Sequence, residues 1–479
     1  MIRKRFWVGL ALSAVLLSHL DAVAQKQLTV EDIYENPALR GKYVSGLQWM
    51  PNSRKFTYYQ RDPETGRRNI WSYDVRTRKR EIFIDSEKVG VLAEERREKR
   101  FTLGNYFWSP DQRHILLPSG NDLYLYDSKT GEVKRLTNDE ARERDPQFSP
   151  DGKKLAYLKN GNLTVLDIGT GAEKQLTTDA SETILIGQFD WVYEEEFGIR
   201  TGFFWSPDGK RIAFWRLDQS RVPEFPIVDY IPTHNQVETM RYPKAGDPNS
   251  IVQIGVVEVK TGATTWMDLG DNDDIYIPRI KWTKSPRTLA ILRLNRDQNH
   301  LEFLLADVVT GSTRVLFEER MENGWIDITD DWRFLNDGRH FIWSSRRDGW
   351  KHLYMCDLQT GDLRAITRGE WDAVSIVGVD EKHKTIYYMS TEVSPLERHL
   401  FGIKFNGKKR WRISRRPGWH RVVLSPNFRY YIDYFSDVTR PTMVTLRKIN
   451  GARIDIIEAN EMPALKEYAI SEPEFLQVP

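Results

Sequence analysis

One turn recurs eight times along the chain, and this repetition restricts the fold more than any other feature of the sequence. In each copy an aromatic or aliphatic residue precedes Ser-Pro-Asp-Gly or a variant of it, and an apolar run typical of a strand follows. The copies lie at Trp49–Asn52, Trp108–Asp111, Phe148–Gly152, Trp205–Gly209, Trp282–Ser285, Phe334–Gly338, Val379–Glu381 and Leu424–Asn427. Regular recurrence indicates a fold built from equivalent units that bury their apolar faces against one another.

A second turn follows most copies of the first. Its pattern is Asp-x-x-Thr-Gly, and its glycine can adopt the positive φ that a tight hairpin requires. Copies or variants lie at Asp74–Arg78, Asp127–Gly131, Asp167–Gly171, Glu258–Gly262, Asp307–Gly311, Asp357–Gly361, Asn406–Gly407 and Asn450–Gly451. One unit therefore reads strand, turn, strand, strand, turn, strand, which is typical of a four-stranded antiparallel propeller blade.

Eight such units predict an all-β fold, an eight-bladed β-propeller of four-stranded antiparallel blades with short helical insertions. Closing the ring leaves no long exposed strand edge, and the aromatic content of 12% suits pleated strands. We expect the propeller over residues 48–465, after a lead-in segment at 25–47. A series of unrelated β-sandwiches is the alternative, but it does not explain the constant order of the two turns.

Charge and cysteine content exclude several classes of protein. Lys+Arg total 70 and Asp+Glu total 68, so a globally basic nucleic-acid binder is excluded and we expect no nucleic-acid partner. The single Cys356 excludes an internal disulfide framework and a cysteine-based zinc site. The nine histidines form no close metal-binding pair, so we predict neither a metal nor a cofactor.

The N-terminus has the pattern of an export signal. Basic residues at Arg3–Arg5 precede an apolar run at Phe6–Leu17, and Ala22–Ala24 fits the small-x-small cleavage rule. The apolar run is about 12 residues long, which is short for a membrane span. We therefore expect residues 1–24 to be a signal peptide cleaved near Ala24 and the protein to be periplasmic or extracellular. An uncleaved membrane anchor is the alternative.

Two segments interrupt the repeat, and the first is Ser86–Arg100. It is rich in charge and is predicted to form a helix between the first two blades. Its arginines are Arg96, Arg97 and Arg100. Taken alone, a solvated helix with i,i+4 ion pairs explains this segment.

The second interruption is Phe189–Gly198, just before the expected fourth blade. Three consecutive acids, Glu194, Glu195 and Glu196, stand between aromatic residues. Helical neighbours lie about 100° apart, so two of the three carboxylates can face one point. We expect these two to be partly buried and ionised only beside a cation. A bound ammonium group or a structural ion pair would supply that cation.

These residues resemble a known family. Asp190–Phe197 resembles the glutamate motif of the dipeptidyl peptidase IV family, in the prolyl oligopeptidase superfamily. The resemblance continues through Phe204–Gly209, Val222–Pro223, Asp229–Tyr230 and Arg241–Gly246. It implies an eight-bladed propeller followed by an α/β-hydrolase domain, and serine-type proteolysis that releases N-terminal dipeptides, often Xaa-Pro.

The resemblance also assigns roles to residues. It implies that Glu195 and Glu196 bind the α-ammonium group of a peptide N-terminus. A family arginine binds a substrate carbonyl, and we take Arg96, Arg97 and Arg100 as candidates for it. The stretch Trp325–Ile328 lacks the Phe-Arg pair that some members place near this site.

The sequence lacks the catalytic half of such an enzyme. It contains no Gly-x-Ser-x-Gly nucleophile elbow, so we assign no catalytic residue. Only 55 residues follow Leu424, whereas a hydrolase domain needs on the order of 200. We interpret residues 466–479 as the start of a linker to an absent hydrolase domain.

Two functions remain open at this stage. The chain is either the substrate-gating propeller of an exported serine dipeptidyl peptidase, truncated before its catalytic domain, or a stand-alone, non-catalytic binding propeller. For the first we expect peptide N-termini as ligands and a hydrolase domain in cis or in trans as partner, with a homodimer as a further option.

Overall fold

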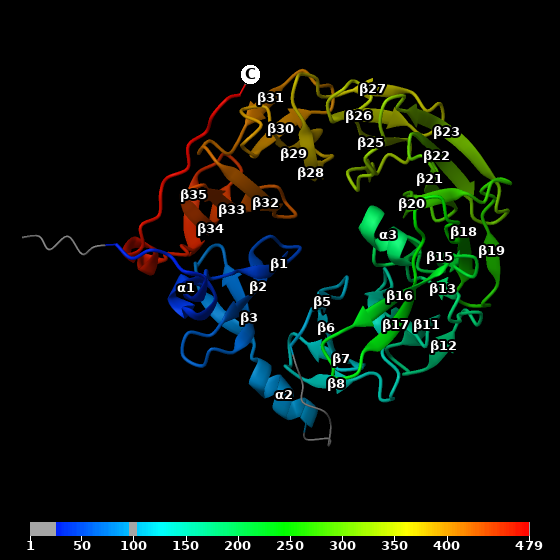
Figure 1. Ribbon diagram of the computed structural model, residues 1–479, viewed down its shortest axis with the longest axis horizontal. Coiled ribbons are helices and arrows are strands. Elements are labelled where there is room, and N and C mark those ends of the chain that lie inside the picture. The colour runs from blue at the N-terminus through cyan, green and yellow to red at the C-terminus, as the bar shows by residue number, and fades with distance from the viewer. Residues whose placement is uncertain (1–24, 95–102, 479) are drawn as a thin grey trace, which may run out of the picture.

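The protein forms a ring of eight β-sheets around a central opening (Figure 1). The structure is a computed structural model that describes residues 25–94 and 103–478. Seven sheets have four antiparallel strands each, and the fourth in chain order has five. This architecture confirms the predicted eight-bladed propeller. The predicted signal peptide and the candidates Arg96, Arg97 and Arg100 lie outside the described residues.

Each blade consists of strands that are consecutive in the sequence. The first four blades contain β1 (Ser45–Trp49), β2 (Lys55–Arg61), β3 (Arg68–Asp74) and β4 (Arg80–Ile84); β5 (Phe107–Trp108), β6 (His114–Ser119), β7 (Asp122–Asp127) and β8 (Val133–Arg135); β9 (Arg144–Phe148), β10 (Lys154–Lys159), β11 (Asn162–Asp167) and β12 (Glu173–Gln175); and β13 (Ile184–Ile186), β14 (Phe203–Trp205), β15 (Arg211–Asp218), β18 (Ile251–Glu258) and β19 (Thr264–Trp266).

The last four blades follow the regular pattern. They contain β20 (Ile275–Trp282), β21 (Thr288–Asn295), β22 (His300–Asp307) and β23 (Thr313–Arg320); β24 (Arg333–Phe334), β25 (His340–Ser345), β26 (His352–Asp357) and β27 (Leu363–Ala365); β28 (Ala373–Asp380), β29 (Thr385–Ser390), β30 (His399–Lys404) and β31 (Arg410–Arg412); and β32 (Trp419–Leu424), β33 (Tyr430–Asp437), β34 (Arg440–Lys448) and β35 (Arg453–Glu458).

Both repeated turns occupy their predicted places. The first turn follows the first strand of each blade, and in blade 3 the Ser149 hydroxyl donates to Asp151 Oδ1 (2.6 Å) and accepts from the Lys154 N–H (2.9 Å). The second turn joins the third and fourth strands, and Gly361 there has φ +78°. A Cβ on Gly361 would lie 2.2 Å from the Leu316 carbonyl oxygen of the preceding blade. Glycine is therefore required here by conformation and by space.

Because neighbouring strands are antiparallel, the connections sort onto two faces of the ring. Both repeated turns lie on one face, which we call the turn face. The links between second and third strands, and those between blades, lie on the other. That second face carries the insertion of blade 4, the helix α3 (Trp191–Glu196), and we call it the α3 face.

Apolar side chains pack between neighbouring blades all around the ring. The first and last blades meet in the same way, where Phe56, Tyr58 and Tyr73 belong to one buried cluster with Ile432 and Leu446. Such burial contributes roughly 1.5–3 kcal/mol for each large side chain. The ring therefore closes by side-chain packing between sheets.

Blade 4 departs from the repeat. Its innermost strand is divided into β13 and β14, which both pair with β15. The segment that carries α3 fills the gap between them. The insertion therefore lies inside blade 4, whereas the sequence predicted it just before that blade. A further hairpin of β16 (Glu224–Asp229) and β17 (Gln236–Arg241) projects between β15 and β18 outside the eight blades. The sequence analysis did not predict this hairpin.

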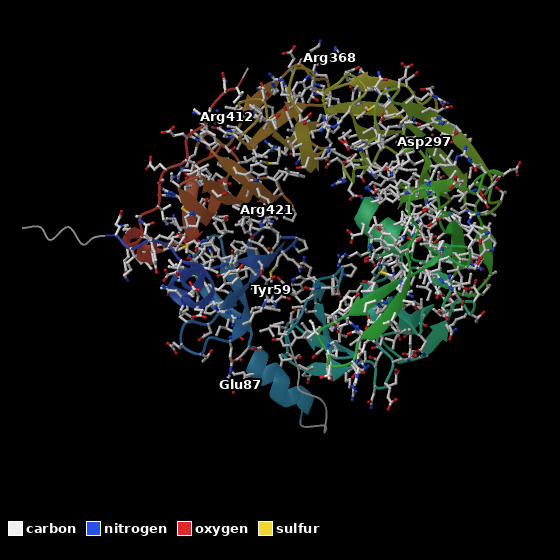
Figure 2. All side chains as sticks on the ribbon, in the orientation of Figure 1. Tyr59, Glu87, Asp297, Arg368, Arg412 and Arg421 are labelled. Atoms are coloured by element: carbon white, nitrogen blue, oxygen red, sulfur yellow. The ribbon has the colours of Figure 1, made fainter. Side chains whose placement is uncertain are left out.

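The remaining helices are short and peripheral. They are α1 (Val30–Glu35), α2 (Ser86–Glu94) and two 3₁₀ turns, η1 (Pro37–Leu39) and η2 (Pro463–Glu467). The helix α2 begins where the first charged insertion was predicted, and Glu87 on it lies at the outer margin of the ring (Figure 2). Across residues 25–94 and 103–478, no helix is long and apolar enough to cross a membrane.

Candidate functional site

The helix α3 lies at the inner margin of the ring, beside the central opening (Figure 1). Asp190 caps its N-terminus, and the Asp190 carboxylate accepts hydrogen bonds from the Tyr193 N–H (3.0 Å) and the Ser250 hydroxyl (2.5 Å). A side-chain cap of this kind stabilises a helix by about 1 kcal/mol. Burial raises the pKa of Asp190, and the nearby negative charge of Glu194 adds a smaller effect in the same direction.

Aromatic residues anchor the buried side of α3. Tyr193 is 2% exposed, and its hydroxyl accepts the Ile277 N–H from the neighbouring blade (3.0 Å). Its ring stacks on Phe189 at 5.6 Å between centroids, and Phe197 meets Tyr276 edge to face at 5.1 Å. Burial raises the pKa of Tyr193 well above its ordinary value, so the phenol is neutral. The helix is thus fixed by contacts from two blades.

Two glycines close the base of the insertion. The Gly202 N–H donates to the Gly187 carbonyl (3.1 Å), which brings the ends of the interrupted strand together. A Cβ on Gly202 would lie 2.5 Å from the carbonyl carbon of Gly187. Only glycine permits this approach without a backbone shift.

The three glutamates occupy the solvent-facing side of this anchored helix. Glu194, Glu195 and Glu196 are all exposed, so the expected partial burial of Glu195 and Glu196 is wrong. Tyr193 and Phe197 are buried against the blades, whereas Trp191 is itself exposed, and the three carboxylates stay open to solvent. Within the part of the chain that the structure describes, no Lys, Arg or His forms an ion pair with them, and the Gln298 amide lies 3.4 Å from Glu196 Oε2. The structure therefore provides three adjacent anionic groups that are open to a ligand.

Asp145 adds a fourth acid, which the sequence analysis missed. It lies in β9, the innermost strand of blade 3, where the pairing register shifts. Its φ of +53° is unusual for a residue other than glycine, although aspartate tolerates this region. Burial raises the pKa of Asp145, the charges of Arg144 and Arg142 oppose this increase, and the charge of Glu194 adds a smaller upward effect. The sequence Arg144-Asp145-Pro146 at a strand start was the available signal, because proline in a strand often marks a bulge.

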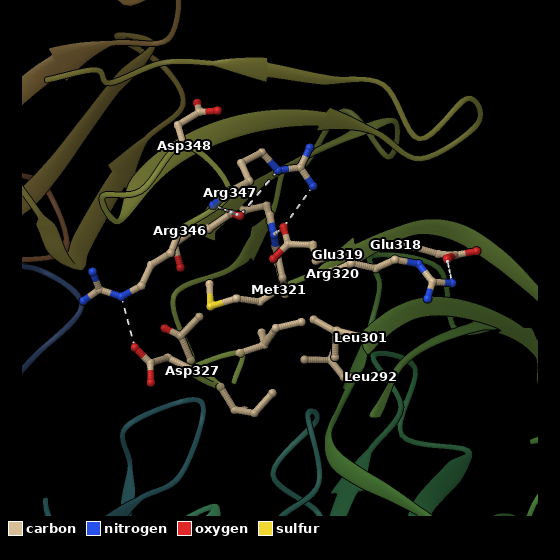
Figure 3. Close-up of a pocket in the computed structure, with 16 residues that line it drawn as sticks. Leu292, Leu301, Glu318, Glu319, Arg320, Met321, Asp327, Arg346, Arg347 and Asp348 are labelled. Carbon is tan, nitrogen blue, oxygen red and sulfur yellow. Dashed lines mark hydrogen bonds and ion pairs between the residues drawn. The ribbon is translucent and has the colours of Figure 1, made fainter. Parts of the chain in front are cut away.

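A cavity of about 320 Å³ adjoins this site between blades 5 and 6 (Figure 3). Its wall includes Ile326, whose N–H donates to the Gln298 carbonyl (2.7 Å), so one short loop connects the cavity to Glu196. Leu292, Leu301 and Met321 give it an apolar side. Charged residues of both signs line the rest.

The arginines around this cavity are already paired with acids. Arg346 binds Asp327 (3.0 Å) and Asp372 (3.1 Å), and Arg347 binds Glu319 (3.0 Å). Arg346 uses all three guanidinium nitrogens in its ion pairs, whereas Arg347 donates hydrogen bonds from Nε and Nη2. The assignment of Arg96, Arg97 or Arg100 to bind a substrate carbonyl stays a prediction, since these residues lie outside the described part of the chain.

One group of described side chains has the composition of a metal site. The ligand atoms of His300, Glu302 and Glu318 lie within 4.8 Å of one another. However, Arg293 binds both carboxylate oxygens of Glu302 (2.7 and 2.8 Å), and Arg320 pairs with Glu318 (2.9 Å). Because the arginines neutralise these carboxylates, the group is an ion-pair network and not an open cation site.

Comparisons with known proteins agree with the fold. The family described as the dipeptidyl peptidase IV (DPP IV) N-terminal region matches residues 109–442. A probable dipeptidyl peptidase 4 of Emericella nidulans is 24% identical, with 94% of this chain and 62% of the relative covered. A dipeptidyl peptidase 4 of Trichophyton rubrum is 26% identical, with 78% of this chain and 52% of the relative covered.

A solved structure is also similar. The crystal structure of Porphyromonas gingivalis dipeptidyl peptidase 4 superposes with a TM-score of 0.82 and 29% identity, covering 94% of this chain and 65% of that one. The chain thus spans less than two thirds of the length of these relatives. Since the family match covers most of the eight blades, the chain belongs to the family of the dipeptidyl peptidase IV N-terminal region.

Proposed function

We propose that this chain is the substrate-gating propeller of an exported serine dipeptidyl peptidase, and that Glu195 and Glu196 bind the free amine of a peptide substrate. The observation that supports this most directly is the placement of exposed carboxylates, without a partner cation among the described residues, on a rigidly anchored helix beside the central opening. An α-ammonium group has three donors and one charge, which suits two adjacent carboxylates.

The anchoring of α3 gives the proposed site its specificity. A helix fixed by Asp190, Tyr193 and Phe197 holds its carboxylates at a constant position. If the amine is bound there, the peptide can reach a nucleophile only at a set number of residues, and two extended residues span about 7 Å. The propeller would thereby act as a ruler for dipeptide release.

The catalytic serine in this proposal comes from a hydrolase domain that associates in cis or in trans. The first blade strand, β1, starts on the α3 face, and the last blade strand, β35, ends there. The chain therefore enters and leaves the ring of blades on the face that carries Glu195 and Glu196. By itself, the given chain is expected to release no product from Gly-Pro or Ala-Pro chromogenic substrates.

The test measures amine recognition directly. Ala-Pro-containing tripeptides with a free or an acetylated N-terminus are titrated into the wild-type chain and into Glu195→Gln and Glu196→Gln variants. In a fusion with a family hydrolase domain, each variant should lose about 10- to 150-fold in kcat/KM, because a charge-assisted hydrogen bond contributes roughly 1.5–3 kcal/mol. Acetylation of the substrate should remove the difference between wild type and variants.

Glu194→Gln is the matched control, because Glu194 is equally exposed on the same helix. The resemblance assigns the amine to the second and third glutamates, so this variant should keep most of the activity. Equal losses in all three variants would indicate a general field effect and not a specific amine site. Full activity in Glu195→Gln and Glu196→Gln would exclude the proposed role and favour a non-catalytic binding propeller.

A further inference from the structure

An open groove runs along the boundary between blades 6 and 7. It consists of two hollows of about 950 and 430 Å³ that share Arg364 and Asn406. The Arg364 side chain donates to the Phe405 carbonyl across the boundary (3.0 Å). A Cβ on Gly407 would lie 2.7 Å from the Ile366 carbonyl oxygen, so the turn of blade 7 rests directly on blade 6. The walls of the groove are therefore fixed.

The groove is strongly basic. Seven lysines and arginines line its two hollows, against two acids, Asp337 and Glu381. Both acids already accept hydrogen bonds, Asp337 from His340 (2.7 Å) and Glu381 from a backbone N–H (2.8 Å). The lining therefore holds five more basic than acidic side chains.

Four of these cations are open to a ligand. Their side chains are exposed, and none of them forms an ion pair within residues 25–94 and 103–478. The four are Arg368, Lys382, Lys384 and Lys408. Arg368 lies at the outer margin of the ring, where a large ligand can approach (Figure 2).

Two other inter-blade grooves in the described part of the chain have no such excess. Between blades 3 and 4 the lining holds four lysines and three acids, and between blades 5 and 6 it holds two cations and two acids. The whole chain has a net charge of only +2. The sequence next to the basic groove continues the pattern, because residues 398–432 contain ten Lys and Arg and no acid. The charge is thus concentrated at one place on the ring.

We propose that this groove binds a linear anionic polysaccharide that carries sulfate or carboxylate groups. An extended chain of anionic sugars can follow both hollows and meet the exposed cations in turn. Single-stranded nucleic acid fits less well, since such sites stack bases on several large aromatic side chains, and Phe405 is the only Phe, Tyr or Trp in the lining of these two hollows.

The position of the groove separates it from the proposed peptide site. Its walls include Glu381–Lys384 and Asn406–Gly407 on the turn face, and they continue to Arg368 in the link between blades 6 and 7, at the outer margin of the ring. The helix that carries Glu195 and Glu196 lies at the inner margin, beside the central opening. A polysaccharide bound at the outer margin would leave the central opening free. The expected role is retention of the protein on an anionic matrix while the central opening meets peptides.

Two triple variants test the proposal in the full chain. Arg368→Glu, Lys384→Glu and Lys408→Glu together reverse three exposed groove charges. Lys153→Glu, Lys210→Glu and Lys260→Glu together make the same change in charge on exposed turn-face lysines of blades 3 and 4. Binding of a heparin hexasaccharide and of a polygalacturonate oligomer is measured by calorimetry at about 50 and 200 mM salt, where screening of exposed charges differs.

The groove variant should lose about 30-fold or more in affinity for the polysaccharide that binds the wild type, while the control variant should lose less than about threefold, since distant exposed charges are screened. Preference for the sulfated or the carboxylated probe identifies the anionic group, and either preference supports the proposal. Unchanged melting temperatures establish that both variants fold. Equal losses in both variants, no binding of either probe, or tighter binding of single-stranded DNA than of both probes would overturn it.

Discussion

Blades 3 and 4 are neighbours that share the same turns and strand order, but only blade 4 carries an insertion in its innermost strand. In both, the strand order follows the repeat, and the first turn is closed by a serine that donates to an aspartate, at 2.6 Å from Ser149 to Asp151 and 2.7 Å from Ser206 to Asp208. Blade 3 has a continuous innermost strand, whereas that of blade 4 is divided by the segment that carries the glutamates. The scaffold accepts an insertion without changing its own turns.

The two blades also differ in where their stabilising contacts originate. The turn of blade 3 is completed by residues at most five positions apart. The insertion of blade 4 depends on Ser250 and Ile277, which lie 60 and 84 positions from their partners. A local turn can form from its own sequence, while α3 is held only in the assembled ring.

The largest effect is expected at the base of the insertion. Gly202→Ala should lower the free energy of unfolding by about 3 kcal/mol, because its Cβ would overlap the backbone of Gly187. Gly171→Ala, in the open turn of blade 3 with φ +75° and nothing within 4 Å, should cost only about 1–2 kcal/mol. Denaturant unfolding of both variants measures the contrast. Equal costs would mean that the approach of Gly202 to Gly187 is not tight in solution.

The next effect concerns a buried phenol. Tyr193→Phe leaves the Ile277 N–H without an acceptor and should cost about 2 kcal/mol. Tyr157→Phe in blade 3 removes a hydroxyl that donates to Glu173, which keeps Lys159 as a partner, so about 0.5–1 kcal/mol is expected. Unfolding midpoints of the two variants compare these costs. A larger cost for Tyr157→Phe would contradict the assignment of Tyr193 as the main anchor of α3.

A pH-dependent effect is expected at Glu143, close to the start of the innermost strand of blade 3. Burial raises the pKa of Glu143 from 4.5 to about 7. The native state therefore holds this proton to a higher pH than the unfolded chain, and the free energy of unfolding falls as the pH rises from about 4.5 to about 7. Glu143→Gln removes this contribution, so its stability relative to wild type should improve by about 1–2 kcal/mol across that interval, with allowance for solvent screening.

Urea unfolding of wild type and Glu143→Gln at about pH 5 and about pH 7.5 measures the change in relative stability, because most of the Glu143 titration falls between these two values. Glu140→Gln is the control, because Glu140 is an exposed neighbour of Glu143. If the relative stability of Glu143→Gln is independent of pH, the Glu143 carboxyl is hydrated in solution.

The smallest expected effect is the difference in stability loss between two matched serine variants. Ser149→Ala and Ser206→Ala each remove the same pair of hydrogen bonds from a fully buried serine. Each should cost about 1–2 kcal/mol, and the two costs should agree within about 0.5 kcal/mol. Melting curves recorded side by side provide the comparison. A clear difference would show that the insertion alters the scaffold of blade 4.

The number of blades was predictable from the sequence because each turn is encoded locally. Ser-Pro-Asp-Gly and Asp-x-x-Thr-Gly specify their own hydrogen bonds and backbone angles, so the eight copies predicted eight sheets in the correct order. The glutamate motif was recognisable from its resemblance to a family, and its first turn is also local, since Asp190 caps the helix by accepting the Tyr193 N–H.

Other features were decided by contacts between distant residues. The sequence indicated that Glu195 and Glu196 stand among aromatic residues, but only the packing of Tyr193 and Phe197 into the neighbouring blade determined that the carboxylates face the solvent. The proximity of Asp145 depends on a bulge in another blade. The exposure of a side chain is a property of everything that surrounds it, and a turn motif carries no information about those surroundings.

The basic groove is another feature that contacts between distant residues decide. The acid-free stretch at residues 398–432 is visible in the sequence, yet Arg368, Lys384 and Lys408 come from two blades and meet only because the ring packs one blade against the next. The sequence by itself therefore determined the repeat, the turns and the capped helix, since these need only neighbouring residues. The tertiary structure decided which charges are exposed together, because the distances between blades are set by packing around the whole ring.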